Sequence, residues 1–304
     1  MSRYNQNKQI IILRHNGGQL GNQLLLFTSV YAYCLEKNYM CINPSFYAYN
    51  KHFNFSAPGF FSKLFSSLSK FKFYKSHATF YILYRFFTHA ITFFQNGLIV
   101  KDDPKNIFFL PPSPDKNRNH NHILKQIELE KNRVYLDGWA FRNPVGLKKY
   151  RKQLIKAFQP KEAIVKKTEN FIKQIGGKNN LIGVHIRQGD YKSKDFMNGT
   201  WYFNEEEVAN ILRAYLEKRH KDPKKTVFVI CSDGPLSLHP FKGLNIKLGI
   251  GSMIEDLLTL SMCNEIIGSN STFGSLAAYL GNIPFFVFDR QKKYIRGEGD
   301  HLFP

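Results

Sequence analysis

The stretch from Leu181 to Tyr191 holds residues whose types and spacing could do chemistry. It reads LIGVHIRQGDY, an apolar run that carries His185 and ends in Arg187 and Asp190. Such a run predicts a buried strand, and in open α/β sheets ligands bind at the carboxyl ends of the strands. A guanidinium can bind phosphate or carboxylate through two N–H groups, and a histidine can hydrogen-bond through either ring nitrogen. The stretch therefore predicts a strand end that binds an anion.

Two other predicted strands in the second half also end in polar residues. The strand at 226–231 is followed by Asp233, and the strand at 265–268 is followed by Ser271 and Thr272, where a helix begins. Helix N-termini bind phosphate through their backbone amides. Asp256 lies on the helix that precedes the second of these strands. These positions predict a pocket for a nucleoside diphosphate at one edge of a parallel sheet.

The predicted elements of the second half alternate between strand and helix, which is typical of βαβ units and an α/β fold. We expect strands at 181–186, 226–231, 265–268 and 284–288, and helices at 205–220, 253–263 and 271–280.

The first half opens in a similar way. A strand is expected at 10–13, followed by the glycine-containing loop GGQLGNQ, which includes Gly21 and Asn22, and by a helix at 24–36. A second strand is expected at 133–137 and a helix at 148–158. The loop is not GxGxxG, and no acidic residue between 36 and 102 could hold a ribose hydroxyl. A nicotinamide dinucleotide is therefore not expected here.

The charge of the chain is unevenly distributed. The net charge is +20, and residues 1–159 hold 23 Lys and Arg against 7 Asp and Glu, whereas residues 160–304 hold 20 against 16. Pro160 and this change in charge predict a domain boundary that separates residues 1–159 from residues 160–304. A basic first half is compatible with phosphorylated ligands, an anionic membrane surface or nucleic acid.

Residues 44–100 are rich in aromatic and basic side chains and are expected to form a helical insertion. One interpretation is a Lys-bearing face that contacts anionic lipid; the other is a packed insertion with a solvated Lys face. The apolar region 80–100 is interrupted by polar residues, so it is a poor membrane span. No RNP, KH or zinc-finger pattern occurs, and we expect no nucleic-acid partner.

The cysteines and the start of the sequence indicate where the protein is expected to be found. The four cysteines form no CxxC pair, so we expect free thiols. No signal-like segment occurs at the start, so we expect a cytoplasmic protein, with peripheral contact at the inner membrane face as an open alternative.

Four segments, in this order, resemble the GDP-fucose-dependent α-1,2-fucosyltransferase family. GGQLGNQ at 17–23 resembles the family's GGxGNQ, and HIRQGDY at 185–191 resembles its HxRRGDY. CSD at 231–233 resembles a strand end of the family, and DLLTLSMC at 256–263 runs into SNSTFGSLAAYLG as in the family's last block. The resemblance spans about residues 10–290.

The resemblance implies the GT-B architecture, with two Rossmann-like domains facing a cleft. The C-terminal domain would bind the GDP-sugar and the N-terminal domain would lie on the acceptor side. Such enzymes transfer fucose from GDP-fucose with inversion, without a metal or other cofactor. The implied acceptor is a galactose-containing glycan, fucosylated through an α-1,2 link, in carbohydrate biosynthesis or protein glycosylation.

The resemblance also implies roles for matching residues. These roles are to recognise the guanine, to bind the diphosphate, to approach the sugar and to orient another side chain. His185 and Asp256 would recognise guanine; Arg187, Ser271 and Thr272 would bind the phosphates, with Asp233 and Gly21 in the donor-binding set; Asn22 would approach the sugar and the acceptor; and Asp190 would orient Arg187. The resemblance identifies no general base.

Departures from the family pattern leave alternatives open. Gln188 stands where the family has a second Arg, so a cation that could meet the phosphates is lost, and residues 274–276 replace a Ser-Trp-Trp segment. The alternatives are a GT-B glycosyltransferase with a different acceptor, linkage or nucleotide-sugar donor, and a non-catalytic protein that binds a nucleotide sugar.

Each site residue also has a purely structural interpretation. His185 could be a core histidine, Arg187 could form a surface pair with Asp190, Asp256 could be a carboxylate on a helix surface, and Asn22 could cap the following helix.

Overall fold

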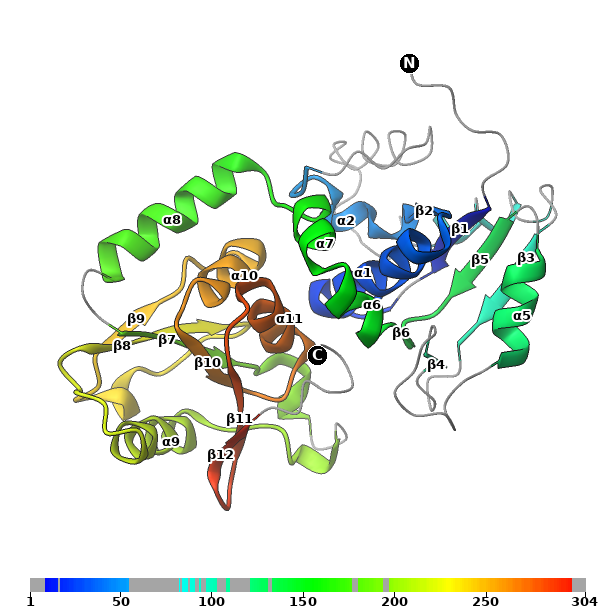
Figure 1. Cartoon of the computed structure of the whole chain (residues 1–304). Helices are drawn as coiled ribbons and strands as arrows, with labels where there is room; N and C mark the ends of the chain where they lie inside the picture. Colours follow the sequence, from blue (N-terminus) through cyan, green and yellow to red (C-terminus); the bar gives the residue numbers. More distant parts are fainter. Residues whose placement is uncertain are drawn as a thin grey trace. The chain divides into compact units, whose positions relative to one another are not determined.

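The computed structural model divides the chain into two compact units, Met1–Gln159 together with Pro304, and Pro160–Phe303. The first unit ends where the charge balance of the sequence changes. The structure describes residues 9–15, 17–54, 82, 84–86, 88–90, 93, 97–102, 108–109, 121–130, 133–176, 180–193 and 197–296. Figure 1 labels the elements of each unit.

The N-terminal unit is built on a four-stranded parallel sheet with the order β2-β1-β5-β3. The strands are β1 (Ile10–His15), β2 (Met40–Ile42), β3 (Leu98–Lys101) and β5 (Arg133–Asp137). A second, two-stranded sheet pairs β4 (Phe108–Phe109) with β6 (Phe141–Arg142). The helical elements are α1 (Leu20–Lys37), η1 (Pro44–Phe46), α2 (Tyr47–Asn50), α5 (Asn121–Leu129), α6 (Pro144–Lys149) and α7 (Arg151–Ala157).

Helix α1 begins four residues earlier than the sequence predicted. Leu20 and Leu24 are one turn apart and both are fully buried, so the apolar face of the helix already starts at Leu20. The loop is correspondingly shorter, and Gly21 and Asn22 lie in the first turn of the helix. The helix ends at Lys37, and its last turn is closed by the C-cap Asn38, which has a left-handed backbone and donates its N–H to the carbonyl of Cys34.

Both ends of the predicted insertion 44–100 belong to the core of the N-terminal unit. Phe46 packs against Phe27 of α1 and against Phe53, in each case with 5.6 Å between ring centroids. At the other end, residues 98–101 form β3 and pair with β5. The predicted insertion is therefore too long, because its two ends pack on α1 and in the sheet. Residues 55–81 lie outside the described part of the chain.

The residues described between 82 and 93 are helical and have two different sides. Tyr84 and Thr88 are buried, and the hydroxyl of Tyr84 donates to the carbonyl of Arg14, 2.6 Å away. Ile82, Phe86 and Phe93 are exposed. No helix among the described residues is long and apolar enough to cross a membrane.

The C-terminal unit is built on a six-stranded sheet with the order β12-β11-β10-β7-β8-β9. All its pairings are parallel except that of β11 with β12. The strands are β7 (Asn180–Ile186), β8 (Thr226–Ser232), β9 (Ile246–Leu248), β10 (Glu265–Gly268), β11 (Phe285–Asp289) and β12 (Lys293–Arg296). The helices are α8 (Glu162–Gly176), α9 (Glu205–Lys218), α10 (Met253–Ser261) and α11 (Thr272–Gly281), with short 3₁₀ turns η4 (Gly189–Lys192), η5 (Met197–Gly199) and η6 (His239–Phe241).

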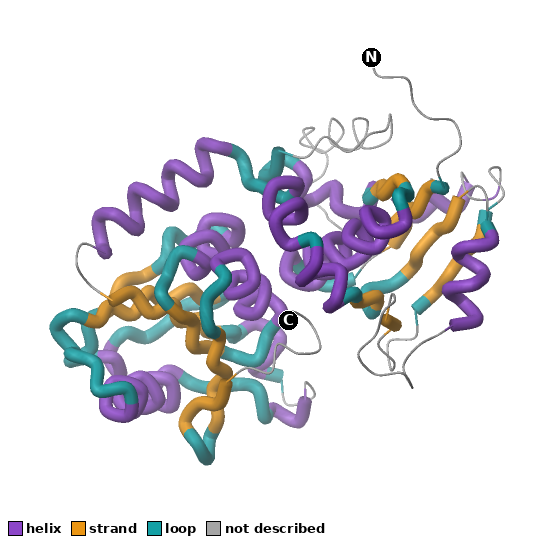
Figure 2. The backbone as a smooth tube through the Cα atoms, viewed as in Figure 1, coloured by secondary structure: helices purple, strands orange, loops and turns teal. Residues whose placement is uncertain are grey.

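Helices cover both faces of this sheet, as Figures 1 and 2 show. Ile182, Val184 and Ile186 of β7 point to one face and pack in a cluster with the apolar side of α9. Leu181 points to the other face and packs in a cluster with Cys263 and with residues of α8. Because β7 is buried on both faces, its sequence is continuously apolar instead of alternating.

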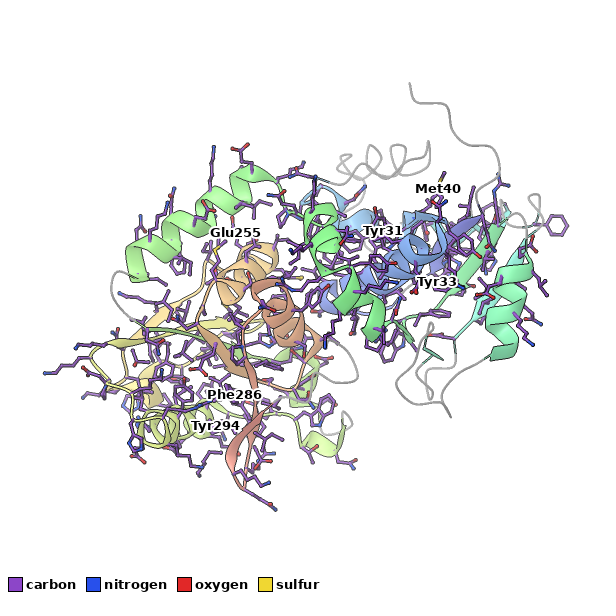
Figure 3. The ribbon with its side chains drawn as sticks, viewed as in Figure 1. Tyr31, Tyr33, Met40, Glu255, Phe286 and Tyr294 are labelled. Atoms are coloured by element: carbon purple, nitrogen blue, oxygen red, sulfur yellow. The ribbon has the colours of Figure 1, made fainter. Side chains whose placement is uncertain are left out.

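The sequence predicted the central strands of this unit to within two residues at each end, but it missed the peripheral elements. α8, β9 and β12 were not predicted. β12 is held at the edge of the sheet by Tyr294, whose ring packs edge-on against Phe286 of β11 with 5.7 Å between centroids (Figure 3). Glu255, also labelled there, binds Lys167 and so links α10 to α8.

The approach of β10 to β7 depends on glycine at position 268. A Cβ on Gly268 would lie 2.6 Å from the backbone carbonyl oxygen of His185, which cannot move without breaking the strand pairing. We predict that Gly268→Ala lowers the free energy of unfolding by about 3 kcal/mol, the upper range for overpacking. Urea denaturation followed by circular dichroism measures this. Gly176→Ala is the control, because its added Cβ would make only an ordinary contact of 3.4 Å with Leu181. Equal stabilities of the two variants would contradict the prediction.

Candidate active site

Three neighbouring strands of the C-terminal sheet end at the same edge. His185 of β7 pairs in register with Cys231 of β8 on one side and with Gly268 of β10 on the other. The residues that follow each strand therefore meet at this edge. They include Arg187 after β7, Asp233 after β8, and residues 269–272 after β10, as the sequence predicted.

Arg187 is held between two carboxylates. Its Nε and Nη2 lie 2.9 and 2.8 Å from Oδ1 of Asp190, and its Nη1 lies 2.8 Å from Oδ2 of Asp233. The side chain of Asp190 is 53% exposed, whereas that of Asp233 is 25% exposed and also accepts the backbone N–H of Gln188 at 2.6 Å. Asp233 is therefore the firmer of the two partners, and Asp190 makes the contact that an orienting role requires.

Backbone contacts fix the strand end beneath Arg187. The fully buried Ser269 accepts the backbone N–H of Arg187 at 2.9 Å through its hydroxyl. The hydroxyl of Tyr191 donates to the backbone carbonyl of Asn270, 2.7 Å away, and so ties the loop after β7 to the loop after β10. The sequence did not predict these two residues as part of the site. Their only signal was their position within the two polar strand-end segments.

His185 is buried and neutral. Burial, and secondly the charge of Arg187, lower its pKa to about 3. Its Nδ1 lies 3.1 Å from the hydroxyl oxygen of Ser271, and its ring lies 5.0 Å from that of Phe273. The same hydroxyl oxygen accepts the backbone N–H of Gly274, so its own proton is available to Nδ1. This arrangement favours the tautomer in which Nε2 carries the hydrogen and can donate it.

The N-terminus of α11 lies beside His185. Ser271 is its N-cap and Thr272 its first residue, and both side chains are partly exposed. The first amides of a helix lack intrahelical partners and carry a partial positive charge. The structure thus brings together the predicted phosphate-binding groups Arg187, Ser271 and Thr272 with His185.

Asp256 lies in the first turn of α10 and is only 6% exposed, so the interpretation as a surface carboxylate is wrong. Its Oδ1 accepts the backbone N–H of Gly251 at 3.0 Å. Its carboxylate and the sulfur of Cys231 both lie 2.6 Å from the position that a Cβ on Gly249 would take. Burial raises the pKa of Asp256, and the backbone N–H groups of the preceding loop oppose that rise. Asp256 is therefore next to Cys231 of β8, the residue that pairs with His185 of β7.

Gln188, which follows Arg187, is buried inside the C-terminal unit. Its side chain is 1% exposed, and its Nε2 donates to Glu205 of α9 at 3.3 Å. Its Oε1 is buried without a hydrogen-bond partner, close to Gly234. The side chain at 188 is thus directed toward α9, inside the unit, and the loss of a phosphate contact at this position stays a prediction.

Gly21 and Asn22 lie in the first turn of α1, in the N-terminal unit. The N-cap of α1 is Gln19, so the interpretation of Asn22 as a cap is wrong. The Nδ2 of Asn22 lies 2.6 Å from the position that a Cβ on Gly18 would take, which places its side chain over the glycine loop. The approach of Asn22 to a sugar stays a prediction.

A known protein family matches the part of the chain that contains this site. The sequence profile of glycosyl transferase family 11 matches residues 129–283, just over half of the chain. The chain belongs to glycosyl transferase family 11. The matched region runs from the last residue of α5 to beyond α11, and so includes every residue of the cluster around Arg187.

Curated relatives of this family 11 chain are similar over about half of its length. Galactoside α-(1,2)-fucosyltransferase 2 of mouse is 30% identical over 166 residues, which cover 48% of this chain and 43% of the mouse protein. The rat protein of the same name is 30% identical over 164 residues, with 48% and 42% covered. The aligned region thus spans less than half the length of these relatives.

Solved structures show the fold. The α-1,6-fucosyltransferase NodZ of Bradyrhizobium, co-crystallised with GDP, matches with a TM-score of 0.56 and 13% identity, covering 96% of this chain and 99% of that one. An Arabidopsis thaliana FUT1 variant in complex with GDP matches with a TM-score of 0.55 and 11% identity, covering 97% and 75%. The predicted α/β class, with two sheets like those of GT-B fucosyltransferases, is confirmed.

The neutral state of His185 predicts how stability depends on pH. Below the usual pKa of 6.5 the unfolded chain binds a proton that the folded chain takes up only near pH 3. The contribution of His185 to the free energy of unfolding is therefore fully present above pH 6.5. It is lost, by up to about 1.4 kcal/mol per pH unit, as the pH falls toward 3. We predict that His185→Asn flattens the pH dependence of urea unfolding between pH 6.5 and 4 by this amount. An unchanged slope would show that His185 is not the group that resists protonation. Burial also lowers the pKa of His15, to about 4, so His15→Asn, in the other unit, should flatten the pH dependence in the same direction.

Proposed function

We propose that the protein transfers fucose from GDP-fucose to a hydroxyl of a galactose-containing glycan, forming an α-1,2 link with inversion. The observation that carries the proposal is the edge of the C-terminal sheet, where a guanidinium, a neutral histidine and a helix N-terminus meet. These groups suit a nucleoside diphosphate. Family membership supports fucosyl transfer, and the two rodent relatives support the galactoside acceptor and the α-1,2 link.

Arg187 would stabilise the negative charge that grows on the diphosphate as the bond to fucose breaks. Donors that are fixed in advance around a developing charge usually contribute more to such catalysis than any other single effect. Asp233 fixes the guanidinium from the side of β8. Asp190 is more exposed, and exposed ion pairs are weak, so the diphosphate can replace Asp190 at little cost. The amides at the start of α11 and the hydroxyls of Ser271 and Thr272 would bind the remaining phosphate oxygens.

His185 and Asp256 would recognise the guanine. The Nε2–H of His185 is a donor in the tautomer that Ser271 favours, and it can serve an acceptor of the base. A carboxylate at Asp256 can accept from the N1–H and N2–H edge that distinguishes guanine from adenine. Two backbone N–H groups of the loop before α10, those of Ile250 and Gly251, favour the charged form of Asp256 that this contact needs.

A peripheral membrane contact is a second, independent proposal. Ile82, Phe86 and Phe93 are four and seven residues apart, a spacing that places them on one side of a helix, and all three are exposed. Arg85 lies among them, and residues 1–159 hold 23 Lys and Arg against 7 Asp and Glu, so they carry most of the net positive charge of the chain. An apolar face within a basic unit suits the interface of an anionic bilayer.

The transferase proposal is tested by incubating the protein with GDP-fucose and a panel of galactosides, and by following GDP release and product linkage. We expect turnover with galactosides and an α-1,2 product. Turnover with a different nucleotide sugar only would overturn the donor assignment. Tight binding of GDP without turnover on any acceptor would instead favour a nucleotide-sugar-binding protein.

The role of Arg187 is tested by two substitutions. We predict that Arg187→Ala lowers kcat by about 10² to 10³, the usual cost of removing one group that stabilises transition-state charge. Arg187→Lys keeps the positive charge but lacks the two parallel N–H groups of the guanidinium, so it should retain part of the activity. Circular dichroism and thermal unfolding check that both variants fold. A folded Arg187→Ala variant with normal kcat would contradict the assignment.

The membrane contact is tested by sedimentation with lipid vesicles. We predict that the protein sediments with vesicles containing phosphatidylglycerol and much less with pure phosphatidylcholine. The double variant Phe86→Ser/Phe93→Ser should lose most of this binding, because both changes remove apolar surface from the exposed side. Equal binding to both kinds of vesicle, or unchanged binding of the variant, would leave this side of the helix as ordinary solvated surface.

A further inference from the structure

We propose that Trp139 is the platform on which the acceptor sugar stacks, with the face of a galactose ring against its indole. This inference rests on the proposed function and deepens it. Trp139 follows β5 in the N-terminal unit, and neither the family resemblance nor the sequence pattern assigns it a role.

Trp139 lies at the edge of the N-terminal sheet where β1, β5 and β3 end. The backbone N–H of Gly138 donates to the carbonyl of His15 at the end of β1, and that of Asp102 donates to the carbonyl of Asp137 at the end of β5, with N···O distances of 2.8 and 2.9 Å. Carboxyl ends of parallel strands are where ligands bind in such sheets. The turn that holds Trp139 is thus built into that edge.

The backbone of this turn is tightly constrained. Gly138 has a φ of +127°, which strongly disfavours other residues, and the carboxylate of Asp102 occupies the place where a Cβ would be. Oδ2 of Asp102 accepts the backbone N–H groups of Trp139 and Ala140, at 2.6 and 2.8 Å. Because the backbone is fixed at three successive residues, the direction in which the Trp139 side chain leaves the sheet is fixed too.

The indole ring itself is supported by a buried charge. The guanidinium carbon of Arg142 lies 5.5 Å from the ring centroid, and Arg142 is only 1% exposed. Its Nη1 donates to the carbonyl oxygens of Trp139 and Phe141. Burial lowers the pKa of Arg142 to about 10, so the group is still cationic at neutral pH and attracts the ring.

Even so, Trp139 is 37% exposed, although Ala140 and Phe141 beside it are buried. A Cβ on Gly17 would lie 3.6 Å from Cδ1 of Trp139, so this edge of the ring faces the glycine loop. The same loop leads directly into the first turn of α1 and Asn22. The structure therefore holds a rigid, partly exposed indole next to the segment that the family resemblance associates with the acceptor.

The chemistry of the turn fits a galactoside. In galactose the axial O4 leaves the C–H groups of C3, C4 and C5 together on one face, and this apolar face suits the electron-rich face of an indole. O2 is equatorial at the rim of the ring, so stacking leaves it accessible for reaction. The carboxylate of Asp102 lies beside the turn as an acceptor for sugar hydroxyls.

The chain offers a direct optical test, because Trp139 and Trp201 are its only tryptophans. In Trp201→Phe all tryptophan emission comes from Trp139. We expect lactose to shift that emission saturably, and cellobiose, whose terminal sugar differs from galactose at C4, to shift it much less. In Trp139→Phe the remaining tryptophan, which packs near Tyr191 in the C-terminal unit, should not respond to lactose. A flat Trp139 signal up to concentrations well above the lactose KM would overturn the inference.

Steady-state kinetics give an independent readout. Trp139→Ala should raise the KM for lactose about tenfold or more, the effect of losing a contact of about 1.4 kcal/mol, while GDP affinity and the slow hydrolysis of GDP-fucose by water stay unchanged. Trp139→Leu keeps the apolar bulk and covers the case in which the Ala variant fails to fold. Leu129→Ala, which removes another exposed apolar side chain of the same unit, is the control and should leave the KM unchanged.

The outcomes separate this inference from the proposed function. Normal turnover on galactosides with an unchanged KM in both Trp139 variants would overturn the platform and leave the transferase standing. A lactose-dependent shift of Trp139 emission in a protein that transfers no fucose would support the platform and overturn the transferase.

Discussion

The C-terminal unit depends on how closely β10 approaches β7. Only a glycine at position 268 lets the two backbones pair at His185, and this pairing brings Ser269 under the amide of Arg187. The same approach sets the start of α11 beside the imidazole. The chemistry of the site is therefore a consequence of strand register: a shift of one residue would turn His185 to the other face and separate it from Ser271.

The elements that the sequence predicted well are those whose signal is local. β7, β8 and β10 are buried on both faces and read as continuous apolar runs, and their polar ends mark the binding edge directly. β12 and α8 were missed for the opposite reason. β12 is a four-residue edge strand that depends on Phe286 of its neighbour, and α8 covers the sheet with only a narrow apolar stripe.

The site residues also divide into those with a local sequence signal and those whose surroundings depend on tertiary packing. The positions of Arg187, Asp233 and Ser271 could be predicted because each lies within three residues of a strand end. The surroundings of Gln188 could not, because the group that its side chain meets is Glu205, on a helix whose placement depends on tertiary packing. The burial of Asp256 was likewise unpredictable, since α10 presents Glu255 and Asp256 in succession and sequence alone does not tell which lies against Cys231.

The contacts of Gln188 also join separate elements of the C-terminal unit. Its side-chain amide donates to Glu205 in the first turn of α9, and its backbone N–H donates to Asp233 after β8. The residue next to Arg187 therefore links the ends of two strands to a helix, so the segment that carries the guanidinium is anchored through its neighbour as well as through its own carboxylate partners.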